Sequence, residues 1–152
     1  MTTPTVSKLD PDRYASYGPL ALRVALGLVF IAHAYAKASI FTFAGTAQFF
    51  EANGFPGWTA YPVFAAELAG GVALVLGVKV RWVAAALIAV MLGALKTHLG
   101  HGWMFTGAGG GWEYPAFLIA ALAAQWAMGP GAYPLASRSA ARVQLAASRV
   151  HA

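Results

Sequence analysis

The sequence predicts an all-α polytopic membrane protein, a four-helix bundle with both termini in the cytoplasm. Composition gives the first indication, because 59% of the 152 residues are hydrophobic and only 10% are charged. Soluble domains carry about 25% charged residues, and a chain of this size cannot bury so large an apolar excess in one core. The second indication is that the apolar residues form four long runs, and the third is that basic residues flank these runs.

The chain divides into a polar N-terminal arm (1–16), a four-span membrane domain (17–135) and a basic C-terminal tail (136–152). Pro19 suits the first turn of the first helix, where a missing N–H has no cost. A hydrophobic stretch of about 20 residues suffices to cross the hydrocarbon core. The predicted spans are 20–40, 61–78, 82–95 and 114–128.

The segments between these spans differ in charge and in aromatic content. Residues 41–60 are aromatic, which predicts a loop or short helix at the headgroup level, with turns at Asn53-Gly54 and Pro56-Gly57. Lys79 and Arg81 form a short basic turn, and more basic residues lie in the arm and the tail. The positive-inside rule therefore places the arm, this turn and the tail in the cytoplasm.

Composition also excludes several functions. The net charge of +5 comes from residues that flank the runs, not from a basic stripe with interleaved aromatic residues, so we predict no nucleic-acid partner. The chain has no cysteine, which excludes disulfides, thiolate metal sites and thiol chemistry of its own. Residues 1–16 lack the apolar region of a cleavable signal peptide.

Polar residues of the spans are predicted to gather at the non-cytoplasmic end, where every span contributes. His33 and Lys37 are four residues apart and therefore share one helix face, whereas Arg23 lies deeper. Between the third and fourth spans, residues 96–115 (K-T-H-L-G-H-G-W-M-F-T-G-A-G-G-G-W-E-Y-P) form a polar, aromatic mouth with a glycine-rich centre. The predicted cluster comprises His33, Lys37, Glu67, Lys96, His98, His101 and Glu113.

Simpler roles remain open for these residues. Lysines near span ends often extend to the interface, and Glu113 is favoured by a helix dipole in any case. His98 and His101 lack a convincing third ligand, so no metal is predicted. Intramembrane acids and guanidinium groups are functional candidates by default, although Arg23 and Glu67 could also form a purely structural pair.

The chain resembles the DoxX family of small four-span bacterial membrane proteins. The resemblance rests on order and spacing over roughly 18–135, although Ala34 stands where the family usually has a glycine after the histidine. The matching residues are R-V-A-L-G-L-V-F-I-A-H-A-Y-A-K (23–37), N-G-F-P (53–56), A-E-L-A-G-G (66–71), the basic pair at 79 and 81, and G-W-E-Y-P (111–115).

The resemblance implies a location in the bacterial inner membrane and a link to respiratory redox work. Some relatives are quinone-reducing subunits of thiosulfate oxidation, and others partner thiol-detoxifying or superoxide-handling proteins. It also implies contact with the lipid bilayer, a redox partner protein or larger membrane complex, and self-association as a further option.

The first functional hypothesis is a subunit that binds a quinone in a polar pocket on the periplasmic side. The expected catalytic residues are His33 and Lys37 as donors, and Glu67 or Glu113 as proton carriers. The other expected cofactor-binding residues are Arg23, His98, His101, Trp103, Trp112 and Tyr114. The alternatives are a non-catalytic accessory or assembly subunit, favoured by helices rich in Ala and Gly, and a small transporter, which no inverted repeat supports.

Overall fold

The computed structural model describes residues 15–135, and all regular structure in this part of the chain is helical. Most of the predicted arm and the whole predicted tail lie outside these residues. The helices are α2 (Tyr17–Tyr35), a π-helix η1 (Ala36–Ile40), α3 (Thr42–Ala52), a 3₁₀-helix η2 (Gly57–Thr59), α4 (Ala60–Leu76), α5 (Val80–His98), a second 3₁₀-helix η3 (Leu99–His101) and α6 (Glu113–Met128).

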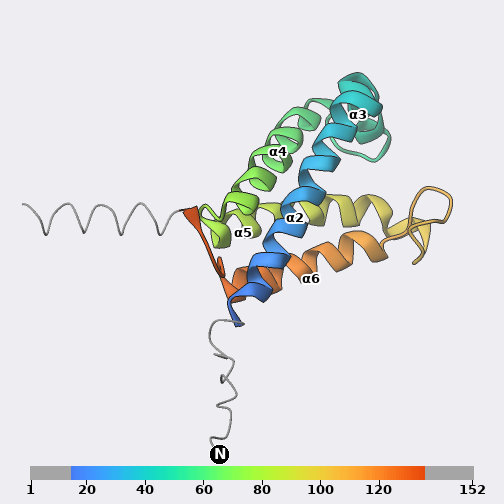
Figure 1. Cartoon of the computed structure of the whole chain (residues 1–152). Helices are drawn as coiled ribbons and strands as arrows, with labels where there is room; N and C mark the ends of the chain where they lie inside the picture. Colours follow the sequence, from blue (N-terminus) through green and yellow to red (C-terminus); the bar gives the residue numbers. More distant parts are fainter. Residues whose placement is uncertain (1–14, 136–152) are drawn as a thin grey trace, which may run out of the picture.

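The long helices pack as two pairs. Figure 1 shows α2 beside α4 and α5 beside α6, with the two pairs inclined to one another and joined at one end by the turn at residues 77–79. The start of α2 and the chain after α6 lie near the same end. The opposite end, called here the outer end because it lies away from this junction, carries α3 and the connector between α5 and α6.

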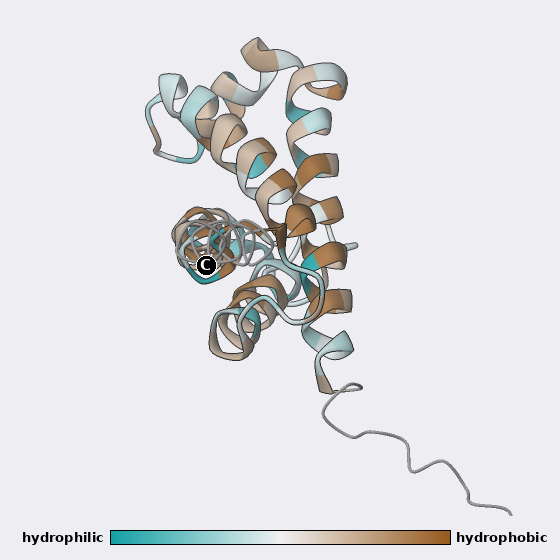
Figure 2. Cartoon of the chain, turned by 60° about the vertical axis from the view of Figure 1, so that its left-hand side comes forward, coloured by the Kyte–Doolittle hydropathy of each residue, from teal (hydrophilic) through white to brown (hydrophobic). Residues whose placement is uncertain are grey.

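Three helical segments are long and apolar enough to cross a membrane: Tyr17–Ile40, Gly57–Leu76 and Val80–His101. Figure 2 shows hydrophobic residues along most of their length, interrupted by few hydrophilic positions. These segments confirm the all-helical prediction and the first three apolar runs. α6 forms where the fourth run was expected, but its 16 residues extend only about 24 Å, less than the roughly 30 Å of hydrocarbon. A fourth crossing therefore stays a prediction.

Glycines set the packing of α2 against α4. A Cβ atom on Gly27 would lie 2.6 Å from the carbonyl oxygen of Gly71, and one on Gly71 would lie 2.7 Å from that of Gly27. The two backbones thus touch, as small residues permit in membrane helices. Gly70, the neighbouring glycine, faces Leu87 of α5 instead. This part of α4 therefore packs closely on both of its helical neighbours.

The core lies where the two helix pairs cross. Its largest fully buried apolar side chains come from all four long helices: Phe30, Leu74, Leu87 and Leu122. Arg23, Glu67 and Gln125 are buried with them at 2% exposure or less. Because buried charges need partners, Arg23 and Glu67 must each be paired within the fold.

The first connector folds largely as a helix. The aromatic segment 41–60 forms α3 and η2, and the predicted turn at Asn53-Gly54 is present, with Gly54 at φ +78°. Phe55 follows this turn and lies under the Lys96 ammonium, 4.6 Å from the nitrogen to the ring centroid. This cation–π contact fastens the first connector to the outer end of α5.

Candidate functional site

In the structure, the residues of the predicted polar cluster do not form a single site but make separate contacts. Glu113 lies in an aromatic pocket, and Lys37 pairs with Glu67 between two spans. His98, at the end of α5, and His101, in η3, contact glycines of the second connector (residues 102–112, between η3 and α6). Arg23 lies toward the opposite end of the fold. The outer end therefore has a cavity with a carboxylate in its wall and, apart from this cavity, a buried ion pair.

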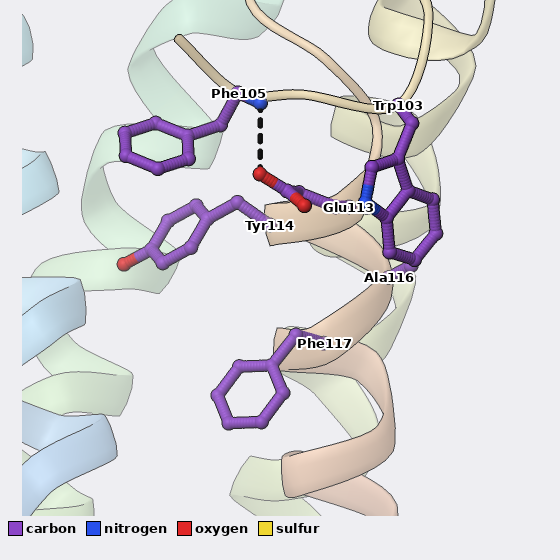
Figure 3. Close-up of a pocket in the computed structure, with 6 residues that line it drawn as sticks. All are labelled: Trp103, Phe105, Glu113, Tyr114, Ala116 and Phe117. Carbon is purple, nitrogen blue, oxygen red and sulfur yellow. Dashed lines mark hydrogen bonds between the residues drawn. The ribbon is translucent and has the colours of Figure 1, made fainter.

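The cavity, called here the aromatic pocket, has a volume of about 470 Å³ and is lined by Trp103, Phe105, Glu113, Tyr114, Ala116 and Phe117. Figure 3 shows the Glu113 carboxylate with the rings of Phe105 and Tyr114 on one side and the Trp103 indole on the other. Phe117 lies one turn further along α6 and is 67% exposed, so the pocket opens at the surface of the bundle. Ligand pockets typically have volumes of about 300–1,000 Å³ and few polar groups.

The second connector is held in place by its own backbone. The Trp112 N–H donates to Gly102 O at 3.0 Å, and the Glu113 N–H donates to Trp103 O at 3.2 Å. A Cβ on Gly111 would collide with the carbonyl oxygens of Trp103 and Met104, so the glycine-rich sequence is what allows this close return of the chain. The connector thereby carries Trp103 and Phe105 to the start of α6.

Glu113 links the connector to the helix. Its Oε1 accepts a hydrogen bond from the Phe105 N–H at 3.0 Å, and the dashed line in Figure 3 marks this bond. Glu113 is also the acidic residue in the first turn of α6, where the helix dipole stabilises a negative charge. The carboxylate therefore has a structural role and remains part of the pocket wall.

His33 of α2 contacts Tyr114, a residue of the pocket wall. The two rings stack with centroids 5.9 Å apart and an interplanar angle of 19°. His33 Nδ1 lies 2.8 Å from Val29 O, so Nδ1 carries the proton and donates to this carbonyl. In the neutral tautomer, Nε2 is then an acceptor. Trp112 contacts the pocket residue Trp103 edge-on, with ring centroids 4.5 Å apart.

Lys37 and Glu67 form a two-pronged ion pair. The Lys37 ammonium donates to both Glu67 oxygens, at 2.9 and 2.8 Å, and the side chains are only 17% and 2% exposed. Lys37 belongs to the π-helix η1, a type of helix that is frequent at functional sites. Its carbonyl accepts a hydrogen bond from the Thr46 hydroxyl at 3.2 Å. The ion pair thus joins η1 to α4, and the Thr46 bond joins η1 to α3.

The histidine pair supports the second connector. His98 Nδ1 donates toward the carbonyl oxygens of Gly109 and Gly110, at 3.2 and 3.1 Å. The His101 ring lies edge-on to His98 and directly against Gly109, where a Cβ would approach it to 2.6 Å. Among residues 15–135, no group of three or more potential metal ligands occurs.

Arg23 contacts backbone carbonyls and not Glu67. Its guanidinium donates to Leu74 O (2.9 Å) and Val75 O (2.6 Å) near the end of α4, and to Ala132 O (3.0 Å) and Tyr133 O (3.3 Å) after α6. The cationic partner of the Glu67 carboxylate is Lys37 instead. The predicted role of Arg23 in cofactor binding therefore receives no support from its contacts, and we do not carry it further.

Sequence reasoning identified half of the pocket wall. Trp103, Glu113 and Tyr114 were predicted as site residues, whereas Phe105, Ala116 and Phe117 were not. Phe117 stands four residues after Glu113, a spacing that places both on one helix face, so the helical periodicity could have revealed it. No comparable spacing points to Phe105, because its position depends on the path of the connector.

Comparison with known proteins supports a family membership. The sequence model of the DoxX family, described as DoxX, matches residues 18–109. A curated protein of Bacillus subtilis (strain 168), named "Putative oxidoreductase CatD", is 38% identical over 80 residues, which cover 53% of this chain and 58% of that protein. The match thus spans little more than half the length of this relative. No solved structure matches the chain.

Proposed function

The chain belongs to the DoxX family, and on this premise we propose that it is a membrane redox subunit that binds a quinone headgroup in the aromatic pocket. The observation that carries the proposal is the pocket itself, with aromatic walls around one carboxylate at the outer end of the helices. The name of the Bacillus subtilis relative, an oxidoreductase, agrees with redox work.

The pocket suits a quinone in size and in chemistry. A volume of about 470 Å³ accommodates a substituted six-membered ring, and the rings of Trp103, Phe105, Tyr114 and Phe117 supply apolar faces against which a flat headgroup packs. The exposed Phe117 lies on the flank of α6, so the isoprenoid tail of a membrane quinone has a path from the pocket to the lipid.

A bound quinone would supply the capacity to accept two electrons and two protons. This chain has no cysteine dithiol to deliver the electrons, so they come from a partner redox protein or from the substrate. Glu113 is the pocket residue that can exchange protons with a ligand, and the indole N–H of Trp103 can donate a hydrogen bond to it. His33 holds the Tyr114 ring by stacking on it.

In this proposal the Lys37–Glu67 pair supports the fold and does not bind the quinone. It is not among the pocket residues, and both Glu67 oxygens are already bound by the ammonium. We therefore assign the pair a supporting role, in which it holds the outer ends of α2 and α4 together. His33 of α2 in turn stacks on Tyr114 and orients its ring. The earlier expectation that Lys37 donates directly to a quinone is replaced by this supporting role.

The proposed arrangement places the protein in the bacterial inner membrane, with α6 as a fourth span, both termini in the cytoplasm and the pocket facing the periplasm. Because the chain has no cysteine, single introduced cysteines give an unambiguous test. We expect an impermeant maleimide added outside spheroplasts to label Gln48→Cys in α3 but not Lys79→Cys in the basic turn. Labelling of Lys79→Cys with protection of Gln48→Cys would invert the topology.

Direct titration tests the pocket. We expect a short-tailed quinone to bind the detergent-purified protein at one site, and Trp103→Ala or Phe117→Ala to weaken binding about tenfold or more, because each removes an aromatic wall worth about 1–3 kcal/mol. Trp82→Ala is the matched control, since Trp82 is 79% exposed at the start of α5, near the opposite end of the fold. Equal affinities in all four proteins would contradict the pocket assignment.

A further inference from the structure

The hydrogen-bonding groups of the aromatic pocket distinguish the two redox forms of a quinone. We infer that the pocket binds the reduced, dihydroxy form more tightly than the oxidised, dicarbonyl form, because the charged group in its wall only accepts hydrogen bonds. This inference rests on the proposed function and adds which form of the ligand the site retains.

The argument begins with the two oxygens of Glu113. Oε1 accepts the Phe105 N–H at 3.0 Å, whereas Oε2 has no hydrogen-bond partner within residues 15–135. The first-turn position on α6 places this carboxylate at the positive end of the helix dipole. An ionised carboxylate accepts hydrogen bonds and donates none. The pocket thus contains one unused acceptor with a negative charge.

A quinol and a quinone meet this oxygen differently. A quinol hydroxyl donates to it and forms an O–H···O⁻ bond, which is among the stronger hydrogen bonds in proteins. A quinone carbonyl has only lone pairs to present, so its oxygen is repelled by the carboxylate, which loses water without gaining a partner. Glu113 therefore favours the reduced form.

The other polar groups in the wall do not reverse this preference. The Trp103 indole N–H is a donor, and both a quinone carbonyl and a quinol hydroxyl can accept from it. The Tyr114 hydroxyl donates or accepts as required, so it serves either form equally. Selection between the forms consequently falls on Glu113 alone.

Tighter binding of the reduced form raises the reduction potential of the bound couple. For a two-electron couple, each tenfold preference corresponds to about 30 mV. A site of this kind makes its quinone a stronger electron acceptor than the same quinone free in the bilayer. It also retains the reduced product more tightly than the oxidised form.

The test is a pair of titrations under argon, with a short-tailed quinone and with its quinol, on the full chain in detergent. We expect wild-type protein to bind the quinol at least about tenfold more tightly, as one hydrogen bond to a charged group provides. Glu113→Gln should remove or reverse the preference, because its amide oxygen can still accept the Phe105 N–H while its amide nitrogen donates to a carbonyl. Glu51→Gln, at an exposed position of α3, is the control and should leave the ratio unchanged.

The outcomes separate the two proposals. If the wild type binds both forms with equal affinity, or if Glu113→Gln binds both and keeps the wild-type ratio, the inference is wrong while the quinone pocket stands. If correctly folded wild-type protein binds neither form, the proposed function and the inference fall together. The wild-type ratio provides a test even if Glu113→Gln does not fold.

Discussion

Replacing Lys37 with methionine is expected to lower the free energy of unfolding by about 3–5 kcal/mol, the cost of removing one partner from a buried ion pair. Glu67 is 1% exposed and the Lys37 ammonium donates to both of its oxygens. The substitution keeps most of the volume of the side chain but leaves a carboxylate without a counter-charge between two membrane helices. Unfolding by SDS titration in mixed micelles, followed by circular dichroism, measures the change.

Two further variants separate charge from packing. The double substitution Lys37→Met with Glu67→Leu removes both charges, and we expect it to recover most of the lost stability, because apolar pairs often replace buried ion pairs at little cost. Lys96→Met is the matched control, since Lys96 is exposed and its ammonium lies over the Phe55 ring. Its loss should cost about 0.5–1 kcal/mol. A double variant as unstable as Lys37→Met would contradict this explanation, because the loss of stability would then not come from the unpaired Glu67 carboxylate.

Replacing Arg23 with methionine is expected to destabilise the protein by about 3 kcal/mol or more. The guanidinium donates to four backbone carbonyls in two segments, at the end of α4 and after α6. A hydrogen bond to a charged group is worth about 1.5–3 kcal/mol, and the carbonyls near a helix end have no partner in the helix itself. Removing Arg23 takes its hydrogen bonds away from both segments, although Leu74 O keeps the Gly77 N–H at 3.0 Å.

The conservative variant makes this prediction specific. Arg23→Lys should recover little stability, because an ammonium is a compact donor that cannot span both segments as the planar guanidinium does. Arg81→Met provides the control, since Arg81 is exposed and makes one long contact of 3.5 Å to Ala127 O. The same unfolding titration applies. Full recovery in Arg23→Lys would mean that charge, and not the geometry of four hydrogen bonds, stabilises this end.

Much of the fold was predictable because the apolar runs have one physical explanation. Helices are the only way for a single segment to satisfy its backbone in lipid, so each run predicted a helix, and α2, α4, α5 and α6 lie where the runs do. The inclination between the two helix pairs was not predictable, because it depends on side-chain packing among four elements.

The site was predictable in its residue types but not in its pairings. Sequence placed Lys37 and Glu67 at the same end of two neighbouring spans, and they do meet, whereas the alternative pairing of Arg23 with Glu67 does not occur. The antiparallel register of α2 and α4 decides between them, since it sets Arg23 beside Leu74 and Val75. That register depends on the contact between Gly27 and Gly71, which no local sequence pattern specifies.

The histidines show a second limit. His98 and His101 stand three residues apart, as metal ligands do, but in the fold they contact the glycines of their own connector. The backbone path of residues 102–112 places these glycines against the histidines. Backbone hydrogen bonds, such as that from the Trp112 N–H to Gly102 O, fix this path. Backbone bonds of this kind leave little trace in side-chain spacing.

The central claim is that the aromatic pocket holds a quinone, and the most direct measurement is to identify what the protein carries when it is purified from its own membrane in mild detergent. The extracted lipids are analysed by mass spectrometry, alongside the proteins that co-elute. We expect close to one quinone per chain in the wild type and in Trp82→Ala, and a clear loss in Trp103→Ala and Phe117→Ala. A folded protein that carries a stable partner and no quinone would contradict this account and indicate an accessory subunit without a cofactor of its own.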